Sequence, residues 1–234
     1  MIRLQLLLAR RRDQPRGLIE AKMASEGQRV RDKLPSGAIH RRAVRLLDDP
    51  TDQSVHGQTV EAGEQFDALF EVGGEDVSPD DLAVAVEGIG ERMTDCIDPE
   101  RSAAVVGTEH TIVSGQQPLV LLFGLRRLPS MTLTEFQDYW LNEHTKVAHR
   151  VPNLKGYRQL HAEPDASAAA AESSGAGIDD IDGVVQSYFA SPQAFSDLMA
   201  QPEVAGEALE DEKNFIDHTR STMALHRMVW DSKA

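Results

Sequence analysis

The sequence predicts an α+β protein made of two tandem ferredoxin-like units, each with the element order βαββαβ. Three observations lead to this prediction. The chain has 234 residues, of which 41% are apolar, enough for one large domain or two small ones. Two stretches of sequence recur in the same order, about 117 residues apart. Each half also shows the same succession of strand-like and helix-like patterns.

The recurrences lie at the start and near the end of each half. The apolar run Ile2 to Ala9 is followed by two arginines, and so is the run Leu119 to Leu125. The run Ile97 to Ser102 returns as Ile216 to Ser221, with a separation only about two residues larger. Two matches in order at nearly one offset favour duplication over chance, and internal repeats of this kind define the architecture.

We therefore expect one unit at residues 1–115 and a second at residues 117–234. In the first unit, strands are expected at about 2–9, 38–47, 66–72 and 102–113, and helices at about 18–33 and 80–96. In the second unit, strands are expected at about 119–125, 155–162, 183–189 and 222–230, and helices at about 133–150 and 192–215. Helix starts are indicated by the capping box Thr132 to Glu135 and by Ser78-Pro79 and Ser191-Pro192.

The link between residues 162 and 183 differs in composition from the elements around it. It is rich in Ala, Ser, Gly and Asp and has almost no large apolar side chain. Such a segment buries too little surface to order itself, so we expect it to be mobile and to act as a flap over a cavity.

Charge and composition exclude several classes of partner. The 24 Lys and Arg against 38 Asp and Glu give a formal charge of −14, which argues against nucleic acid or an anionic membrane as the partner. The longest apolar stretch, Pro118 to Leu125, is far shorter than a membrane helix. The basic Arg10 to Arg12 follows an apolar run, the reverse of a signal peptide. We expect a cytoplasmic protein whose partner is a small molecule or another protein.

The helix expected at 133–150 carries the most informative pattern. Phe136, Trp140 and His144 are spaced by four residues and form one stripe, with Tyr139 and Val147 at its margins. One interpretation is a core stripe in which the histidine is only hydrogen-bonded. The other is an apolar pocket in which His144 acts as a general acid or base.

Two further strands carry titratable candidates. Alternation places Tyr157, Gln159 and His161 on one face of the strand at 155–162. If helices cover that face, Tyr157 and His161 share a cavity with His144; if it faces the barrel interior, they meet the other half of the chain. On the last strand, His226 is a weaker candidate.

Other chemistry is not supported by the spacing of the residues. His144 and His149 are five positions apart, which does not suit two ligands on one helix face, so we expect no metal site. The single Cys96 excludes an internal disulfide framework. The remaining histidines, which we expect in loops or exposed to solvent, are His40, His56 and His218.

The sequence resembles the EthD family, small proteins of the dimeric α+β barrel superfamily. The resemblance covers about residues 119–231 and includes the spacing Phe-x-x-Tyr-Trp-x-x-x-His, which ends at His144, and the later run Gly156 to His161. The first half departs from this pattern, with Lys22 and Met23 in place of Tyr139 and Trp140, and Gly27 in place of His144. The first half therefore resembles a degenerate copy of the EthD-like unit in the second half.

The resemblance implies that the sheets of the two units pair face to face into an intramolecular barrel, giving a monomeric pseudo-dimer or a further homodimer. Some barrel relatives hold haem, but His144 belongs to the EthD signature and not to a haem-ligand pattern, so no cofactor is expected. The expected catalytic residues are His144, Tyr157 and His161. The expected substrate-binding residues are Phe136, Tyr139, Trp140 and His226.

Two functions of different classes follow. The first is a cofactor-independent lyase, dehydratase, isomerase or cyclase that acts on an apolar, aromatic or polycyclic small molecule, with His144 moving a proton. The alternative is a non-catalytic small-molecule-binding or accessory protein of a catabolic or biosynthetic pathway.

Overall fold

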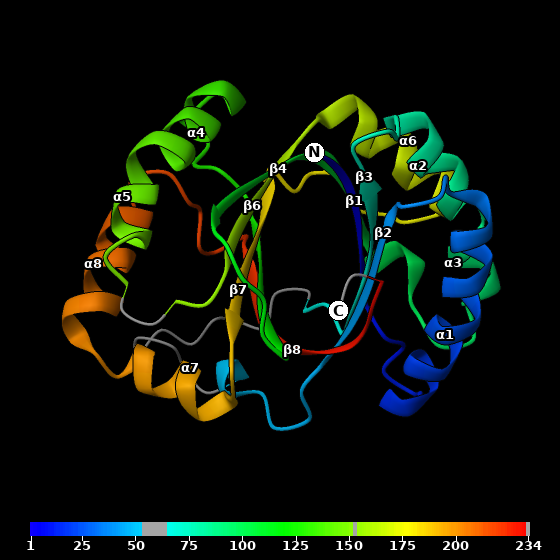
Figure 1. Cartoon of the computed structure of the whole chain (residues 1–234), viewed down its shortest axis with the longest axis horizontal. Helices are drawn as coiled ribbons and strands as arrows, with labels where there is room; N and C mark the ends of the chain where they lie inside the picture. Colours follow the sequence, from blue (N-terminus) through cyan, green and yellow to red (C-terminus); the bar gives the residue numbers. More distant parts are fainter. Residues whose placement is uncertain (53–64, 152–153, 233–234) are drawn as a thin grey trace.

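The computed structural model describes residues 1–52, 65–151 and 154–232. Within them, eight strands close into one antiparallel barrel with helices packed on its outside (Figure 1). The α+β class predicted from the sequence is therefore confirmed. The strands are β1 (Ile2–Leu8), β2 (Ile39–Arg45), β3 (Ala68–Gly74), β4 (Ala103–Val113), β5 (Leu119–Leu125), β6 (Tyr157–Ala162), β7 (Gly183–Phe189) and β8 (Thr222–Asp231).

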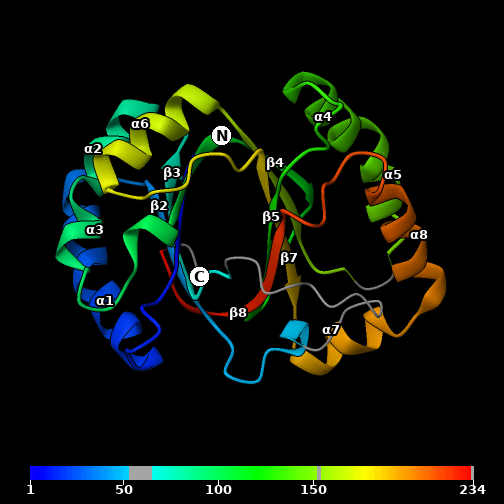
Figure 2. The ribbon, with the colours of Figure 1, turned by 180° about the vertical axis from the view of Figure 1, so that it is seen from behind.

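The helices form two groups on opposite sides of the barrel. Helices α1, α2, α3 and α6 lie on one side, and α4, α5, α7 and α8 on the other (Figure 1, and Figure 2 from behind). They are α1 (Arg16–Lys33), α2 (Pro79–Val86), α3 (Ile89–Arg92), α4 (Leu133–Tyr139), α5 (Thr145–Ala148), α6 (Pro164–Ser174), α7 (Pro192–Met199) and α8 (Pro202–Glu212). Short 3₁₀ turns, η1 (Pro50–Asp52) and η3 (Pro99–Arg101), precede β3 and β4, and a π-helical turn, η4 (Trp140–His144), joins α4 to α5.

The strand order repeats in the two halves of the chain. Around the barrel the strands run β1-β3-β2-β8-β5-β7-β6-β4. The first four strands therefore have the order β4-β1-β3-β2 and the last four the order β8-β5-β7-β6. The halves join through the pairs β2 with β8 and β4 with β6, so the barrel has no free edge.

Two predicted helices are each divided in two. The helix expected at 80–96 is interrupted at Gly88, whose φ of 69° is a left-handed conformation that ends α2. The helix expected at 192–215 is interrupted after α7, and Pro202 starts α8 in the first turn, where its missing N–H is no loss. The capping box at Thr132 forms as predicted, and Ser78 and Ser191 cap their helices, Ser78 with a capping box of its own.

The predicted mobile flap is wrong in its central part. Residues 164–174 form α6, in which Ala170 is fully buried in the same cluster as the first-half side chains Leu4 and Phe70. Ser167 both donates to and accepts from the backbone of Val106 in β4. Alanine is the best helix former, and its small side chain lets the helix approach the sheet closely. The composition that suggested mobility therefore serves tight packing.

The barrel interior is filled by side chains of alternate residues on each strand. One cluster is apolar and includes Leu7, Leu122 and Val184. The other is polar and centres on Glu71, which is fully buried and accepts hydrogen bonds from Gln5, Gln186 and Arg41 at 2.7 to 2.8 Å. Burial raises the pKa of Glu71, but the charges of Arg41 and Arg3 and the hydrogen bonds from Gln5 and Arg41 together lower it by more, so the carboxyl stays ionised.

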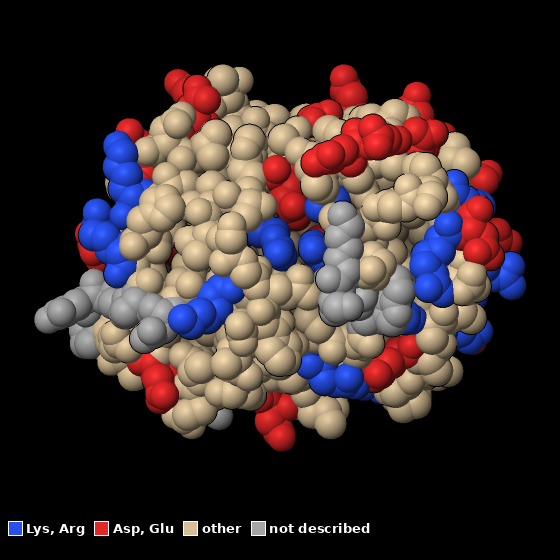
Figure 3. Space-filling model, in the orientation of Figure 1, with Lys and Arg blue, Asp and Glu red and all other residues tan. Residues whose placement is uncertain are grey.

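The acidic excess is visible on the molecular surface. Figure 3 shows acidic side chains gathered over the region where Figure 1 places α2 and α6. In the described part of the chain, no helix is both long enough and apolar enough to cross a membrane.

Candidate functional site

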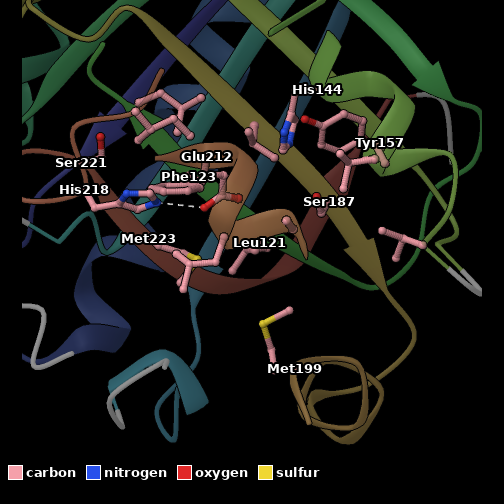
Figure 4. A pocket seen from close by; sticks show the side chains of 18 of the residues that line it. Leu121, Phe123, His144, Tyr157, Ser187, Met199, Glu212, His218, Ser221 and Met223 are labelled. Atoms are coloured by element: carbon pink, nitrogen blue, oxygen red, sulfur yellow. Dashed lines mark hydrogen bonds and ion pairs between the residues drawn. The ribbon is translucent and has the colours of Figure 1, made fainter. Parts of the chain in front are cut away.

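A cavity of about 420 Å³ lies between the outer face of the sheet and the helices of the second half (Figure 4). Strand residues that line it include Leu121, Phe123 and Leu125 of β5, Val185, Ser187 and Phe189 of β7, and Met223 of β8. Helix residues that line it include Trp140, His144, Val147, Ala148, Leu209 and Glu212. The walls are mostly apolar with a few polar groups, which is the usual composition of a small-molecule site.

His144 enters this cavity from the π-helical turn. The stripe predicted from the sequence is buried, since Phe136 and Trp140 are fully enclosed and His144 is 8% exposed. His144 Nδ1 lies 2.7 Å from Asp211 Oδ2, and its ring packs on Phe215 with centroids 5.1 Å apart. π-helical turns are rare and often occur at functional sites.

The carboxylate of Asp211 fixes the orientation of His144. Its second oxygen accepts a hydrogen bond of 2.8 Å from the Tyr139 hydroxyl. The carboxylate is therefore held on both sides and accepts the Nδ1 proton of His144, which leaves Nε2 as the nitrogen for a molecule in the cavity. Asp211 is 67 positions away from His144 in the sequence.

Tyr157 lines the same cavity beside His144 (Figure 4). Its oxygen accepts hydrogen bonds from Trp140 Nε1 at 3.1 Å and from Gln159 Nε2 at 3.4 Å. Burial raises the pKa of Tyr157 to about 12, so the phenol stays protonated. Because both contacts use the oxygen as an acceptor, the O–H proton can be donated to a molecule in the cavity.

His161 lies behind Trp140 and does not line the cavity. Its ring stacks on the Trp140 indole, and its Nε2 lies 3.0 Å from Gln159 Oε1. Burial, followed by the neighbouring His110, lowers the pKa of His161 to about 3. The face of β6 that carries Tyr157 and His161 is thus the one that the helices cover, but only Tyr157 reaches the cavity.

His226 lies on the opposite face of the sheet, inside the barrel. It is fully buried, and its ring nitrogens lie 3.1 Å from the carbonyl oxygens of Ala224 and Phe66. Burial lowers its pKa to about 4. Residues on β8 alternate between faces, so Met223 points to the cavity and His226 points away from it. The structure does not bring this expected substrate-binding residue to the cavity.

Of the other three expected substrate-binding residues, one lines the cavity and two lie behind its wall. Trp140 lines the cavity. Phe136 packs against Phe215 with ring centroids 5.7 Å apart, and Tyr139 packs against the same ring at 5.2 Å. Phe136 and Tyr139 thus support the cavity wall from behind.

Sequence reasoning missed a second histidine in the cavity. His218 lies in a loop, as expected, but it also lines the cavity, with its Nε2 2.9 Å from Glu212 Oε2 (Figure 4). The charge run 210–212, a usual sign of an exposed face, concealed the two carboxylates that hold His144 and His218. Of the other expected loop histidines, His40 is buried in β2, and His56 lies outside the described residues.

The residues that correspond to the site in the first half are different. Met23 and Gly27 in α1 are both buried. A Cβ atom on Gly27 would lie 2.7 Å from Cε1 of His40, so the ring of His40 occupies the space that a side chain at Gly27 would need.

The donor set of the cavity bears on metals and haem. In the described residues, no group of three or more His, Cys, Asp or Glu could hold a metal ion. His144 offers a nitrogen to a haem iron, but none of the described cavity-lining residues is Lys or Arg, which haem propionates would need, and Glu212 adds a negative charge. These residues do not fit haem.

The closed antiparallel barrel with external helices is similar to the fold of solved dimeric α+β barrel proteins. An anthrone oxidase-like protein has 11% sequence identity and a TM-score of 0.60, covering 98% of this chain and 91% of its own. A mutant chlorite dismutase from Candidatus Nitrospira defluvii has 14% identity and a TM-score of 0.54, covering 98% and 92%. At these identities, the likeness extends to the fold alone.

The family resemblance is confirmed for the second half of the chain. Residues 128–219 match the model of the EthD domain. The match includes His144, Tyr157, Asp211 and His218. No curated protein matches the sequence.

Proposed function

We propose that the chain is a cofactor-independent enzyme that moves a proton on an apolar, aromatic or polycyclic small molecule, in a lyase, dehydratase, isomerase or cyclase reaction. The observation that carries this proposal is the His144–Asp211 pair on the wall of a mostly apolar cavity. A carboxylate on Nδ1 keeps the imidazole oriented, with a basic Nε2 facing the ligand. Removal of water from such a cavity strengthens the electrostatic effect of each polar group.

His144 and the hydroxyl of Tyr157, which both line the cavity, suit the enolisation of a ketone. The Nε2 of His144 takes a proton from a carbon next to the carbonyl, so the C–H bond breaks and an N–H bond forms at Nε2. The electron pair moves to the carbonyl oxygen, which accepts a hydrogen bond from the Tyr157 hydroxyl. Return of the proton to another carbon isomerises the molecule, and loss of a leaving group from the enolate completes an elimination.

The remaining residues of the site position these two groups. Asp211 and Tyr139 orient His144 through their hydrogen bonds. His161 and Gln159 support Trp140 and Tyr157 from the side away from the cavity. We therefore assign proton transfer to His144, hydrogen-bond donation to Tyr157 and a positioning role to His161.

The experiment follows deuterium exchange at the benzylic carbon of β-tetralone, a bicyclic ketone, in D₂O by proton NMR. The wild-type protein should accelerate the exchange above the buffer rate, and His144→Ala should remove about a hundredfold or more of that acceleration. His149→Ala is the matched control, because His149 is an exposed residue on the same helical segment. Binding of β-tetralone without accelerated exchange would instead support the binding-protein alternative.

We also propose that residues 1–115 and 117–234 are tandem ferredoxin-like units, of which the first is degenerate. Repeated contacts support this. The backbone N–H of Arg10 donates to Asp67, and that of Arg127 donates to Asp182. Isolated bridges join Arg10 to Ile97 and Arg127 to Ile216. A monomer of 25.7 kDa in light scattering is expected if the internal pseudo-dimer is the whole assembly.

A further inference from the structure

The His218–Glu212 pair has no role in the chemistry described so far. His218 Nε2 lies 2.9 Å from Glu212 Oε2, and the two side chains are only 25% and 21% exposed. Both residues line the cavity, as do the neighbouring Thr219 and Ser221. The imidazole also lies near the ring of Phe123, with centroids 6.2 Å apart.

The two histidines of the cavity are held in the same way but on different sides. Asp211 and Glu212 are consecutive residues at the end of α8, and they bind His144 and His218 respectively. Successive side chains on a helix point about 100° apart, so one carboxylate reaches η4 and the other reaches the segment before β8. Figure 4 shows His218 and Glu212 on one side of the cavity, away from His144 and Tyr157.

The remaining wall of the cavity is mostly apolar. Leu121, Phe123 and Met223 line it from the sheet; in Figure 4 Phe123 lies beside His218, and Leu121 and Met223 lie below the two labelled histidines. A hydrophobic ligand body would fit against these side chains, and any polar group on it would lose its hydration unless it reached a hydrogen-bonding partner. Hydrogen-bonding partners are present at both ends of the cavity: His144 and Tyr157 at one end, and His218 and Glu212 at the other.

We propose that His218 and Glu212 form a second polar subsite, so that the cavity selects flat apolar molecules that carry a hydroxyl group at the His218 end and a hydroxyl or carbonyl group at the opposite end, beside His144 and Tyr157. This inference rests on the proposed function, because it specifies the ligand of the same cavity. Because its Nε2–H donates a hydrogen bond to Glu212, His218 offers Nδ1 to the ligand as an acceptor. Because its Nδ1–H donates to Asp211, His144 offers Nε2 to the ligand as an acceptor.

The experiment compares two probes by isothermal titration calorimetry. One is β-naphthol, and the other is 2,6-dihydroxynaphthalene, whose two equivalent hydroxyl groups lie at opposite ends of the ring system. The wild-type protein should bind the diol about tenfold more tightly than β-naphthol, the effect expected of one additional hydrogen bond in an apolar site. In His218→Leu this advantage should fall to about twofold or less, the statistical factor for a ligand with two equivalent ends.

Two further variants keep the test interpretable. Glu212→Gln preserves the size of the side chain and should reduce the advantage of the diol in the same direction. His149→Leu should keep the full advantage, because its side chain is exposed and outside the cavity. Melting temperatures of all variants identify any that fail to fold.

The inference is overturned if wild-type protein binds both probes equally, or if His218→Leu keeps the advantage of the diol. The exchange assay separates this result from the proposed function. If the advantage is lost in His218→Leu while His144→Ala still exchanges β-tetralone at the wild-type rate, then the second subsite stands and the catalytic role of His144 fails.

Discussion

The imidazole of His161 lies flat against the indole of Trp140, with ring centroids 4.7 Å apart and planes 9° apart. Trp140 in turn lines the cavity. His161 therefore acts on the site through the tryptophan that it supports. Its burial keeps it neutral, because the pKa is lowered to about 3.

This burial predicts an acid dependence of stability. Between the unfolded pKa of about 6.5 and the folded value of about 3, the unfolded state binds a proton at His161 that the folded state does not. Stability is therefore lost as the pH falls through this range. His161→Phe keeps the stacking and removes the titration, so it should lose about 2 kcal/mol less than wild type between pH 7 and pH 5.

Urea unfolding at the two pH values measures this difference. His110, whose ring centroid lies 4.6 Å from that of His161, and His226 are present in both proteins, so their titration does not separate them. Equal losses of stability in wild type and His161→Phe would show that His161 titrates normally in the folded state.

Asp211 is expected to set the tautomer of His144. Asp211→Asn keeps the shape of the side chain but removes the charge that accepts the Nδ1 proton. The exchange rate with β-tetralone should fall about a hundredfold, and nitrogen-15 chemical shifts should show the proton of His144 moving from Nδ1 to Nε2. Asp211→Glu should restore part of the rate. An unchanged tautomer together with a wild-type rate would remove Asp211 from the site.

Tyr157→Phe should affect both stability and exchange. The change leaves the Trp140 indole N–H without its acceptor in a buried place, which costs about 1 to 3 kcal/mol. Loss of the hydroxyl should also lower the exchange rate of β-tetralone by about tenfold or more, since the enolate oxygen loses its donor. Measuring both on one preparation separates them. A destabilised protein with the wild-type exchange rate would assign Tyr157 a structural role only.

The packing of α6 can be tested at a glycine of α3. A Cβ atom on Gly90 would lie 2.7 Å from the backbone oxygen of Ser174, so Gly90→Ala should destabilise the protein by about 1 to 3 kcal/mol. Gly17→Ala is the matched control in α1, because no atom lies within 4 Å of its Cβ position. This control should be neutral or stabilising by up to about 1 kcal/mol. Equal melting temperatures for the two variants would contradict the close contact.

Strands were the best-predicted elements, because each is a short apolar run that ends at charged or turn-forming residues. The strand expected at 183–189 coincides with β7. The stripe from Phe136 to His144 was also predictable, since its spacing is local. Helix interruptions at Gly88 and Pro202 were not recognised, although both residue types favour such breaks.

The partners of the site were harder to predict, because they are distant in the sequence or hidden in a charge run. Nothing local to His144 indicates Asp211, and an acidic run at a helix end usually faces solvent. His218 follows Asp217, whose side chain accepts a hydrogen bond from the backbone N–H of Thr219 in the turn. The same segment also carries a cavity residue, which only the three-dimensional arrangement shows.

Helix α6 belongs to the second half of the chain in sequence but packs into the core of the first half. It is encoded between β6 and β7, yet Ala170 and Ala171 belong to the core of the first half, and Ser173 donates a hydrogen bond of 2.7 Å to Ala83 in α2. Severing the chain between β4 and β5 would thus leave the N-terminal fragment without part of its own core. The two fragments would have to be co-expressed to fold, and a chimera that exchanges halves between relatives would need to carry residues 164–174 together with the N-terminal half.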